Sequence, residues 1–141
     1  MTQPHKFEGA SIALLNSDGE VLLFLRDNFP HIPFPNRWDL PGGRVEDGES
    51  AEQAVRREMI EEIELNLCRP VLFKRFELSD RVEHMFWERA AIDISRTTLH
   101  EGQAMKWFSE GAIEQMTDDT LAFGFRALLL EFFHARPFER H

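Results

Sequence analysis

The chain has 141 residues, 43% of them hydrophobic, and its 13 Phe and 3 Trp predict one domain with a packed core rather than a disordered chain. Its formal net charge of −9 disfavours non-specific binding to nucleic acid or an anionic membrane, because such binding needs basic patches. No apolar run approaches the roughly 20 residues of a membrane span, and residues 1–6 lack the apolar segment of a signal peptide. The single cysteine, Cys68, cannot form an internal disulfide, so we expect a reduced, cytoplasmic setting with Cys68 buried as a small hydrophobe.

The first half of the chain predicts two strands, a loop and a helix. A tight turn at Asp18-Gly19 joins the strands, because glycine tolerates positive φ angles, and prolines between aromatic residues favour the loop. Ser50 and Gln53 form a capping box at the start of the helix. The expected elements are strands over Phe7–Leu15 and Glu20–Arg26, a loop over Asp27–Asp39 and a helix over Ser50–Ile63.

The second half continues with strands and ends in helices. Its expected elements are strands over Val71–Ser79, Arg81–Ile94 and Gln103–Phe108, a short helix over Ser109–Met116 and a longer apolar helix over Asp118–His134. Strands dominate, and two helical regions must cover them. We therefore predict an α+β fold, a mixed central sheet flanked by helices in an α/β/α sandwich.

The helix after Ser50 carries a cluster of carboxylates. Glu58, Glu61 and Glu62 have helical spacing and border the core-facing stripe formed by Val55, Met59 and Ile63. Like charges on one arc repel each other, and a hard divalent cation with oxygen ligands relieves that repulsion. Mg²⁺ or Mn²⁺ is therefore the expected guest, and a solvated acidic face is the alternative. Just upstream, the glycines of Leu40-Pro41-Gly42-Gly43 let the backbone approach a metal or phosphate, and Gly43 offers its carbonyl oxygen.

These residues resemble the Nudix box. The box runs Gly, five residues, Glu, seven residues, Arg-Glu, an aliphatic, any residue, Glu-Glu, any residue, Gly, an aliphatic; the matching residues are Gly43, Glu49, Arg57, Glu58, Met59, Glu61, Glu62 and Leu65. The resemblance implies the Nudix fold and metal-dependent hydrolysis of a nucleoside diphosphate linked to another group, with water attacking a bridging phosphorus. Glu64 replaces the box glycine, and because a left-handed conformation is unfavourable for Glu we expect the helix to continue and end at Asn66.

The resemblance also implies roles for single residues. Gly43, Glu58, Glu61 and Glu62 are the expected metal ligands, and Arg57 is expected to orient a catalytic glutamate. His100-Glu101-Gly102-Gln103 resembles a segment of MutT-type pyrophosphohydrolases, which makes Glu101 a metal ligand or general base. The spacing leaves the base open among Glu61, Glu62 and Glu101.

Two residues outside the box are candidates for substrate binding. Arg26 resembles an arginine that contacts phosphate, and Trp38, with Phe29 and Phe34, offers a stacking surface for a base. The alternatives are a surface arginine at position 26 and core aromatic residues. We therefore expect Arg26 to bind substrate phosphate and Trp38 to bind the base.

We expect the partner to be a small nucleotide substrate, and neither nucleic acid nor a membrane. Diadenosine polyphosphate hydrolases carry a tyrosine downstream of the box, and this chain has no Tyr. ADP-ribose pyrophosphatases carry a proline at a typical spacing after the box, and the chain has no clear proline there. Both resemblances are therefore disfavoured. The resemblance to MutT favours a nucleoside triphosphate such as 8-oxo-dGTP, although Thr120–Gly124 lacks the purine-binding asparagine of such enzymes. A nucleotide-binding sensor without hydrolysis, an enzyme for a nucleotide sugar or other diphosphate, and a homodimer are left open.

Overall fold

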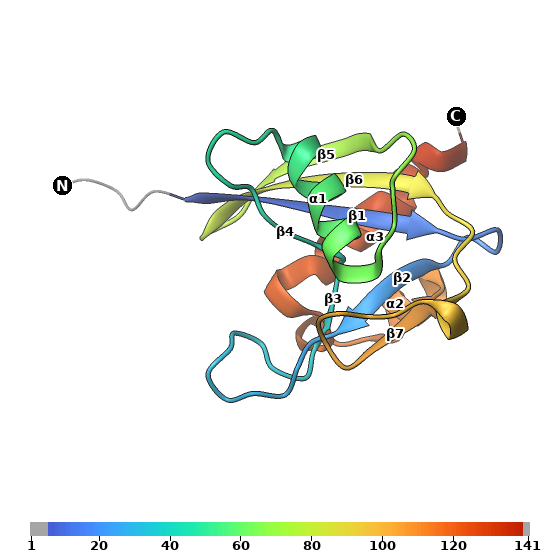
Figure 1. Cartoon of the computed structure of the whole chain (residues 1–141). Coiled ribbons are helices and arrows are strands. Elements are labelled where there is room, and N and C mark those ends of the chain that lie inside the picture. The colour runs from blue at the N-terminus through green and yellow to red at the C-terminus, as the bar shows by residue number, and fades with distance from the viewer. Residues whose placement is uncertain (1–5, 140–141) are drawn as a thin grey trace.

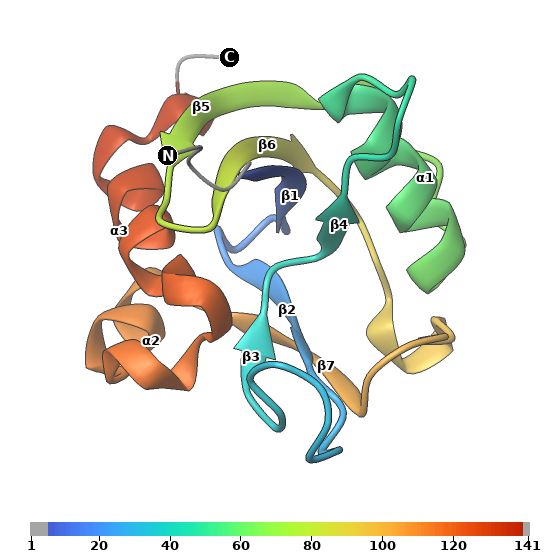
Figure 2. The same ribbon diagram turned by 90° about the vertical axis from the view of Figure 1, so that its left-hand side faces the viewer.

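The computed structural model describes residues 6–139 and contains a mixed sheet with helices on both faces (Figure 1). Helix α1 covers one face, and α2 and α3 cover the other (Figure 2). The predicted fold class is confirmed. The elements are β1 (Phe7–Leu15), β2 (Val21–Leu25), β3 (Trp38–Asp39), β4 (Gly42–Arg44), α1 (Ala51–Ile63), β5 (Val71–Glu77), β6 (Arg81–Arg89), β7 (Ala104–Phe108), α2 (Glu110–Gln115) and α3 (Phe125–Ala135), with 3₁₀ turns over Ile94–Arg96, Asp118–Thr120, Ala122–Gly124 and Pro137–Glu139.

The sheet has two parts, which meet at β1: β5, β6 and β4 pair around β1, and β3 and β7 pair with β2. The functional site lies where these two parts separate. Strand β6 pairs in parallel with β1 along its whole length. The opposite edge of β1 is shared, because antiparallel β4 takes Gly9–Ser11 and antiparallel β2 meets β1 only at Leu15. Strand β2 continues the sheet through β3 and β7, both antiparallel. The chain therefore crosses from β3 to β4 where the two halves of the sheet separate (Figure 2).

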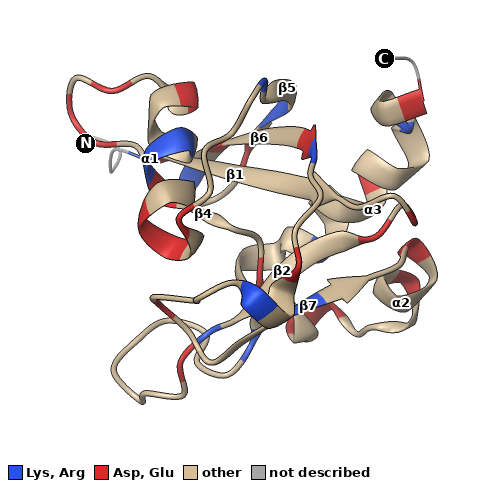
Figure 3. Ribbon diagram, turned by 45° about the vertical axis from the view of Figure 1, so that its right-hand side comes forward, with Lys and Arg blue, Asp and Glu red and all other residues tan. Residues whose placement is uncertain are grey.

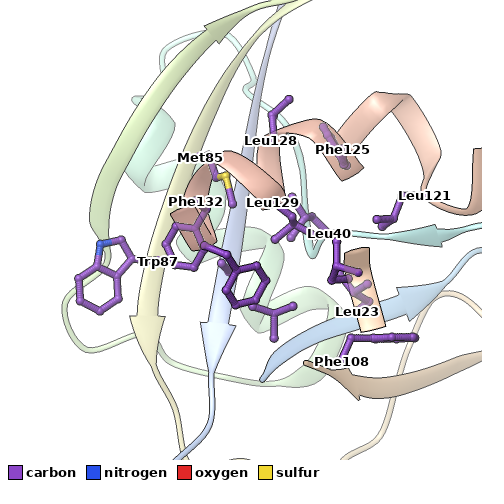
Figure 4. Close-up of a cluster of buried hydrophobic side chains, with 14 of the residues drawn as sticks. Leu23, Leu40, Met85, Trp87, Phe108, Leu121, Phe125, Leu128, Leu129 and Phe132 are labelled. Carbon is purple, nitrogen blue, oxygen red and sulfur yellow. The ribbon is translucent and has the colours of Figure 1, made fainter. Parts of the chain in front are cut away.

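Two hydrophobic clusters pack against the two faces of the sheet, and strand alternation assigns residues to each. Ile12 and Leu14 face α1 together with its buried residues Val55, Met59 and Ile63. The intervening β1 residues face α3, where Figure 4 shows a cluster dominated by aromatic and leucine side chains. Its labelled members are Leu23, Leu40, Met85, Trp87, Phe108, Leu121, Phe125, Leu128, Leu129 and Phe132. Burial on both faces makes β1 the centre of the fold.

Helix α1 begins as predicted but ends earlier. Ser50 accepts a hydrogen bond from Gln53 N–H, and the Gln53 side chain accepts one from Ser50 N–H, which confirms the capping box. The helix ends at Glu64, which adopts a left-handed conformation with φ 56° and donates its N–H to the carbonyl oxygen of Ile60. The expectation that the helix continues to Asn66 is therefore wrong. Glu64 accepts the strained conformation that the box assigns to glycine.

Three other expectations are corrected. The segment Asp118–His134 is not one helix, because Phe123 and Gly124 have positive φ angles of 58° and 73° and break it into 3₁₀ turns before α3. Strand β6 ends at Arg89 instead of Ile94. Cys68 is exposed, not buried. No helix between residues 6 and 139 combines the length and the apolar character that a membrane crossing needs.

Candidate active site

The three glutamates of α1 do not share one environment. Glu62 is buried, and the side chain of Glu58 is 15% exposed, whereas that of Glu61 is 57% exposed. Residues four apart on a helix lie one above the other, so Glu58 and Glu62 point inward together. Figure 3 shows acidic and basic segments adjoining on this helix. The inward pair, rather than the whole cluster, therefore forms one wall of the site.

The close approach of β4 to α1 brings Gly43 against Glu58. A β carbon added to Gly43 would lie 2.4 Å from Glu58 Oε1 and 2.5 Å from Glu58 Cδ. Gly42 is equally constrained, because its φ is 142° and an added β carbon would lie 2.1 Å from the Ala10 carbonyl oxygen. Both glycines are therefore needed to pass the backbone between β1 and the carboxylates of α1.

Arg57 holds the outer side of this carboxylate wall. Its guanidinium donates to both oxygens of Glu49 at 2.8 and 3.0 Å, to Glu58 Oε1 at 2.9 Å and to Glu61 Oε2 at 3.3 Å. It also donates to the Arg44 carbonyl oxygen at 3.1 Å. The hydrogen bonds from Arg57 hold the pKa of Glu49 at about 2. A planar guanidinium with five donors suits this position, because it fixes several carboxylates at once.

The inward glutamates line a cavity of about 320 Å³, which we call the acidic cavity. Its charged lining residues are one arginine and five carboxylates, namely Arg26, Asp27, Asp39, Glu58, Glu62 and Glu101. Gly42 and Gly43 supply its backbone wall. Of the sequence-predicted site residues, the structure thus brings Arg26, Gly43, Glu58, Glu62 and Glu101 together. Glu61 is exposed on the outer side of α1 and does not line the acidic cavity.

Burial and mutual repulsion dominate the electrostatics of the acidic cavity. Burial, followed by the neighbouring carboxyl of Glu58, raises the pKa of Glu62 far above its ordinary value, and burial also raises the pKa of Glu58. Burial raises the pKa of Asp39 to about 6, against the opposing charge of Arg26. Glu62 Oε2 is buried and has no hydrogen-bond partner among residues 6–139. Positive charge placed here would stabilise the ionised carboxylates.

The donor set fits a hard divalent cation by its chemistry. Carboxylate and carbonyl oxygens are the ligands that Mg²⁺ and Mn²⁺ prefer, and Glu62, whose buried Oε2 has no partner among residues 6–139, lines the cavity. Between residues 6 and 139, however, no three acidic, histidine or cysteine side chains already form a closed metal cage. The residues therefore surround the cavity as separate donors, and Mg²⁺ tolerates such sites because it keeps several water ligands.

Glu101 reaches the acidic cavity from a loop that is anchored at both sides. The His100 N–H donates to the Glu62 carbonyl oxygen at 2.9 Å, and the Gln103 N–H donates to the Leu25 carbonyl oxygen at 2.8 Å. The His100 ring also lies 2.8 Å from Glu64 Oε2, so the residue that replaces the box glycine contacts this loop. These bonds place Glu101 between the end of α1 and the end of β2.

A second cavity of about 410 Å³ adjoins the acidic cavity and is lined by aromatic rings, so we call it the aromatic cavity. The two cavities share Arg26, Asp39, Leu40, Gly42 and Gly43. The aromatic rings come from Phe7, Phe34, Phe123 and Phe125. The two cavities therefore lie side by side, and the five shared residues border both of them.

Arg26 lies at the junction of the two cavities. Its Nη1 donates to Asp39 Oδ2 at 2.9 Å and its Nε to the Pro33 carbonyl oxygen at 3.1 Å. Its guanidinium also lies 5.0 Å from the centre of the Phe123 ring. The predicted phosphate-binding arginine is thus positioned by Asp39, a residue that the sequence analysis did not select.

The structure places two predicted stacking residues elsewhere. Trp38 packs edge-on against Phe108 with ring centres 4.8 Å apart and lines neither cavity. Phe29 is exposed and stacks on His31. Phe34 does line the aromatic cavity, where it meets the Phe123 ring edge-on at 4.8 Å.

Sequence reasoning also missed two buried charged residues of β6. Arg81 and Glu83 line the aromatic cavity, yet the sequence analysis gave them no role. Charged residues at alternate positions of an otherwise apolar strand were the available signal, because an inward-facing charge needs a partner or a ligand.

Sequence comparison agrees with this geometry. The chain matches the NUDIX domain family over residues 5–129. A protein of Bacillus subtilis (strain 168), provisionally named as an 8-oxo-dGTP diphosphatase, is 33% identical over 109 residues, which cover 75% of this chain and 68% of that protein. An RNA pyrophosphohydrolase of Baumannia cicadellinicola is 34% identical over 101 residues, which cover 69% of this chain and 55% of that protein. The aligned part is thus about two thirds of the first relative and about half of the second.

Structural comparison leads to the same family. The crystal structure of a MutT protein from Methanosarcina mazei Go1 superimposes with a TM-score of 0.78 at 25% identity, covering 97% of this chain and 99% of that one. A family match over most of the sequence, a shared fold and an acidic helix beside a glycine turn agree. The chain belongs to the NUDIX family.

Proposed function

We propose that this chain hydrolyses a phosphoric anhydride bond of a nucleotide, a nucleoside triphosphate or a related nucleoside diphosphate derivative, with Mg²⁺ or Mn²⁺ as its cofactor. The observation that carries the proposal is the acidic cavity, in which Glu58 and the buried Glu62 lie with Gly43, Asp39 and Glu101. Arg57 and Arg26 pair with Glu58 and Asp39, but Glu62 Oε2 has no partner among residues 6–139 and burial raises the pKa of all three carboxyl groups, which favours a functional reason for gathering them. The relatives named as a diphosphatase and a pyrophosphohydrolase support the same reaction class.

The cation would be held by Glu58, Glu62 and the Gly43 carbonyl oxygen, with Glu61 able to join from the outer side of α1. A bound divalent cation lowers the pKa of water and neutralises phosphate oxygens. Arg57 fixes Glu58 through its 2.9 Å hydrogen bond, so it is a positioning residue. Glu101 lines the acidic cavity from a separate loop, and we assign to it the proton of the attacking water because Glu58 and Glu62 would hold the cation. Arg26, at the cavity junction, would contact a phosphate oxygen.

The aromatic cavity supports a nucleotide over a diphosphate without a base. Bases stack on aromatic rings, and the rings of Phe34 and Phe123 lie directly beside the phosphate-facing Arg26. The names of the two relatives give different substrates, 8-oxo-dGTP for one and RNA for the other. We therefore propose neither of these two substrates for this chain on the strength of the names. An exposed free thiol at Cys68 suits a reducing compartment, and we propose the cytoplasm.

A substrate panel tests the proposal. Nucleoside triphosphates, a nucleotide sugar, ADP-ribose and a dinucleoside polyphosphate are incubated with the protein and Mg²⁺ or Mn²⁺, and phosphate, pyrophosphate and nucleoside monophosphate are measured. We expect a nucleoside monophosphate as product, with release stopped by EDTA and restored by excess Mg²⁺. A sensor would bind a nucleotide without releasing any product, and that outcome would refute the hydrolase proposal.

A further inference from the structure

Strand alternation brings two charged residues of β6 onto the α3 face of the sheet. Arg81 and Glu83 share that face with Met85 and Trp87 of the α3-side cluster. Glu83 is only 2% exposed and Arg81 only 8% exposed. Both nevertheless line the aromatic cavity, so an occupant of that space would lie against these two residues.

The backbone of β1 makes room for the Glu83 carboxyl group. A β carbon added to Gly9 would lie 2.4 Å from Glu83 Oε1 and 3.3 Å from Oε2. Gly9 pairs directly with Glu83 across the parallel β1–β6 ladder. A glycine inside a strand weakens it and commonly marks such a close approach. The carboxyl group therefore occupies a place that any other residue at position 9 would fill.

Arg81 is fixed between aromatic rings and partly neutralises Glu83. Its guanidinium lies 4.5 Å from the centre of the Phe7 ring and 4.3 Å from that of Phe123. Its Nη1 donates to Glu83 Oε1 at 3.3 Å, which is long for a charge-assisted hydrogen bond. The Ser11 hydroxyl is a second group whose hydrogen bonding lowers the pKa of Glu83. An ionised carboxylate can accept about four hydrogen bonds, so these two contacts leave acceptor capacity at Glu83.

We propose that Glu83 is the residue that selects the nucleobase, by accepting hydrogen bonds from the adjacent ring N–H and exocyclic amino group of a guanine-type base. The inference rests on the proposed function, because it assumes that the aromatic cavity holds the base while the acidic cavity holds the phosphates. A carboxylate only accepts hydrogen bonds, so it favours the donor edge of guanine. Adenine places a ring-nitrogen acceptor at the corresponding position, which an ionised carboxylate repels.

The unmodified protein provides the first test. The ratio kcat/KM is measured with Mg²⁺ for GTP, ITP and ATP at pH 8, above the pKa of Glu83, which burial raises to about 7. Hypoxanthine in ITP keeps the ring N–H but lacks the 2-amino group. We expect GTP to exceed ATP by at least about tenfold, with ITP between them, because leaving a buried polar group unpaired is costly.

Two variants test Glu83 itself. In Glu83→Gln the amide can donate as well as accept, so the GTP-to-ATP ratio should fall by about tenfold, mainly through a higher KM for GTP. Gly9→Ala keeps the glutamate but displaces its carboxyl group, and we expect the same loss of preference. Glu88→Gln is the matched control, because Glu88 is a buried glutamate of the same strand that binds the N–H groups of Cys68 and Arg69 and lines neither cavity.

Binding without metal separates this inference from the proposed function. The dissociation constants of GMP, IMP and AMP are measured by calorimetry on metal-free protein, with folding of each variant checked by circular dichroism. Tighter binding of GMP that depends on Glu83 or Gly9 supports the inference even if no nucleotide is hydrolysed, in which case only the hydrolase proposal fails. Equal treatment of the three bases in both assays, or a guanine preference that survives in Glu83→Gln and Gly9→Ala, overturns it.

Discussion

Gly43 lies so close to Glu58 that a β carbon at position 43 would clash with Glu58 Oε1. The contact joins the backbone of β4 to the inward carboxylate of α1 and closes one side of the acidic cavity. It gives the first glycine of the Nudix box a steric reason that is independent of any bound cation.

We predict that Gly43→Ala folds but loses activity. The added methyl group would meet the end of a flexible side chain, so Glu58 can move, yet it then leaves both Arg57 and the cavity wall. We expect kcat/KM to fall about 100-fold with little change in the thermal unfolding midpoint. Gly111→Ala is the control for loss of a glycine, because an added β carbon there meets only Ser109 Oγ at 3.9 Å, its φ is not positive, and Gly111 lies outside the cavity. Activity within a few-fold of the unmodified protein would contradict the assigned role of the contact.

Glu62→Gln and Glu61→Gln are predicted to have unequal effects. Glu62 is buried in the cavity wall, so its loss should lower kcat by about 100-fold or more, whereas the exposed Glu61 should cost about tenfold or less. Glu62→Gln should also raise the unfolding midpoint of the metal-free protein at pH 7, because the raised pKa of Glu62 makes this carboxyl group take up a proton on folding, whereas the amide needs none. Steady-state kinetics and thermal unfolding with EDTA measure both effects. Equal losses of kcat for the two variants would show that side-chain exposure in the free protein does not predict how much each glutamate contributes to catalysis.

The stability of the protein should depend on the ionisation of Glu83. Burial, opposed by the Ser11 hydroxyl and then by Arg81, raises the pKa of Glu83 from 4.5 to about 7 in the folded state. The folded protein thus binds the proton more tightly than the unfolded chain, and the free energy of unfolding falls as the pH rises from about 4.5 to about 7. Glu83→Gln removes this loss. The variant should gain roughly 3 kcal/mol over the unmodified protein between pH 4 and pH 8.

Urea titrations of both proteins at pH 4, 6 and 8 measure that difference. At each pH the free energy of unfolding of the unmodified protein is subtracted from that of Glu83→Gln, and we call this difference the gap. Other groups titrate in both proteins, so the change of the gap with pH is the contribution of Glu83. A gap that stays constant from pH 4 to pH 8 would show that Glu83 has an ordinary pKa in the folded state.

Replacing Glu64 by the glycine of the box should stabilise the fold. Glu64 has φ 56°, and a left-handed conformation costs a residue with a β carbon roughly 1 kcal/mol relative to glycine. The variant loses the contact between Glu64 and His100, but both side chains are exposed, so that loss is less than about 1 kcal/mol. Thermal unfolding of Glu64→Gly, compared with Glu64→Ala, separates the two contributions. A lower midpoint for Glu64→Gly than for Glu64→Ala would show that the conformation is not strained.

The local signals of the sequence predicted helix α1, its capping box and the positions of its carboxylates. These features depend on residues within a few positions of one another, which is why spacing reveals them. The same signals misplaced the end of α1 and missed β3 and β4, which are too short to show a period of two. Those strands exist because β1 and β2 pair with them.

The amino-acid sequence by itself determined the family, the layered fold and the acidic character of the site. Each of these depends on residues that are close together in the chain, or on the order of the predicted elements. Only the tertiary structure decided which glutamates face inward, since a helical wheel does not include the approach of Gly43 to Glu58. It also brought Phe7, Arg81, Glu83 and Phe123 together around the aromatic cavity. Residues that far apart in the chain meet only through the pairing of β1 with β6 and the packing of α3, and no local pattern encodes that contact.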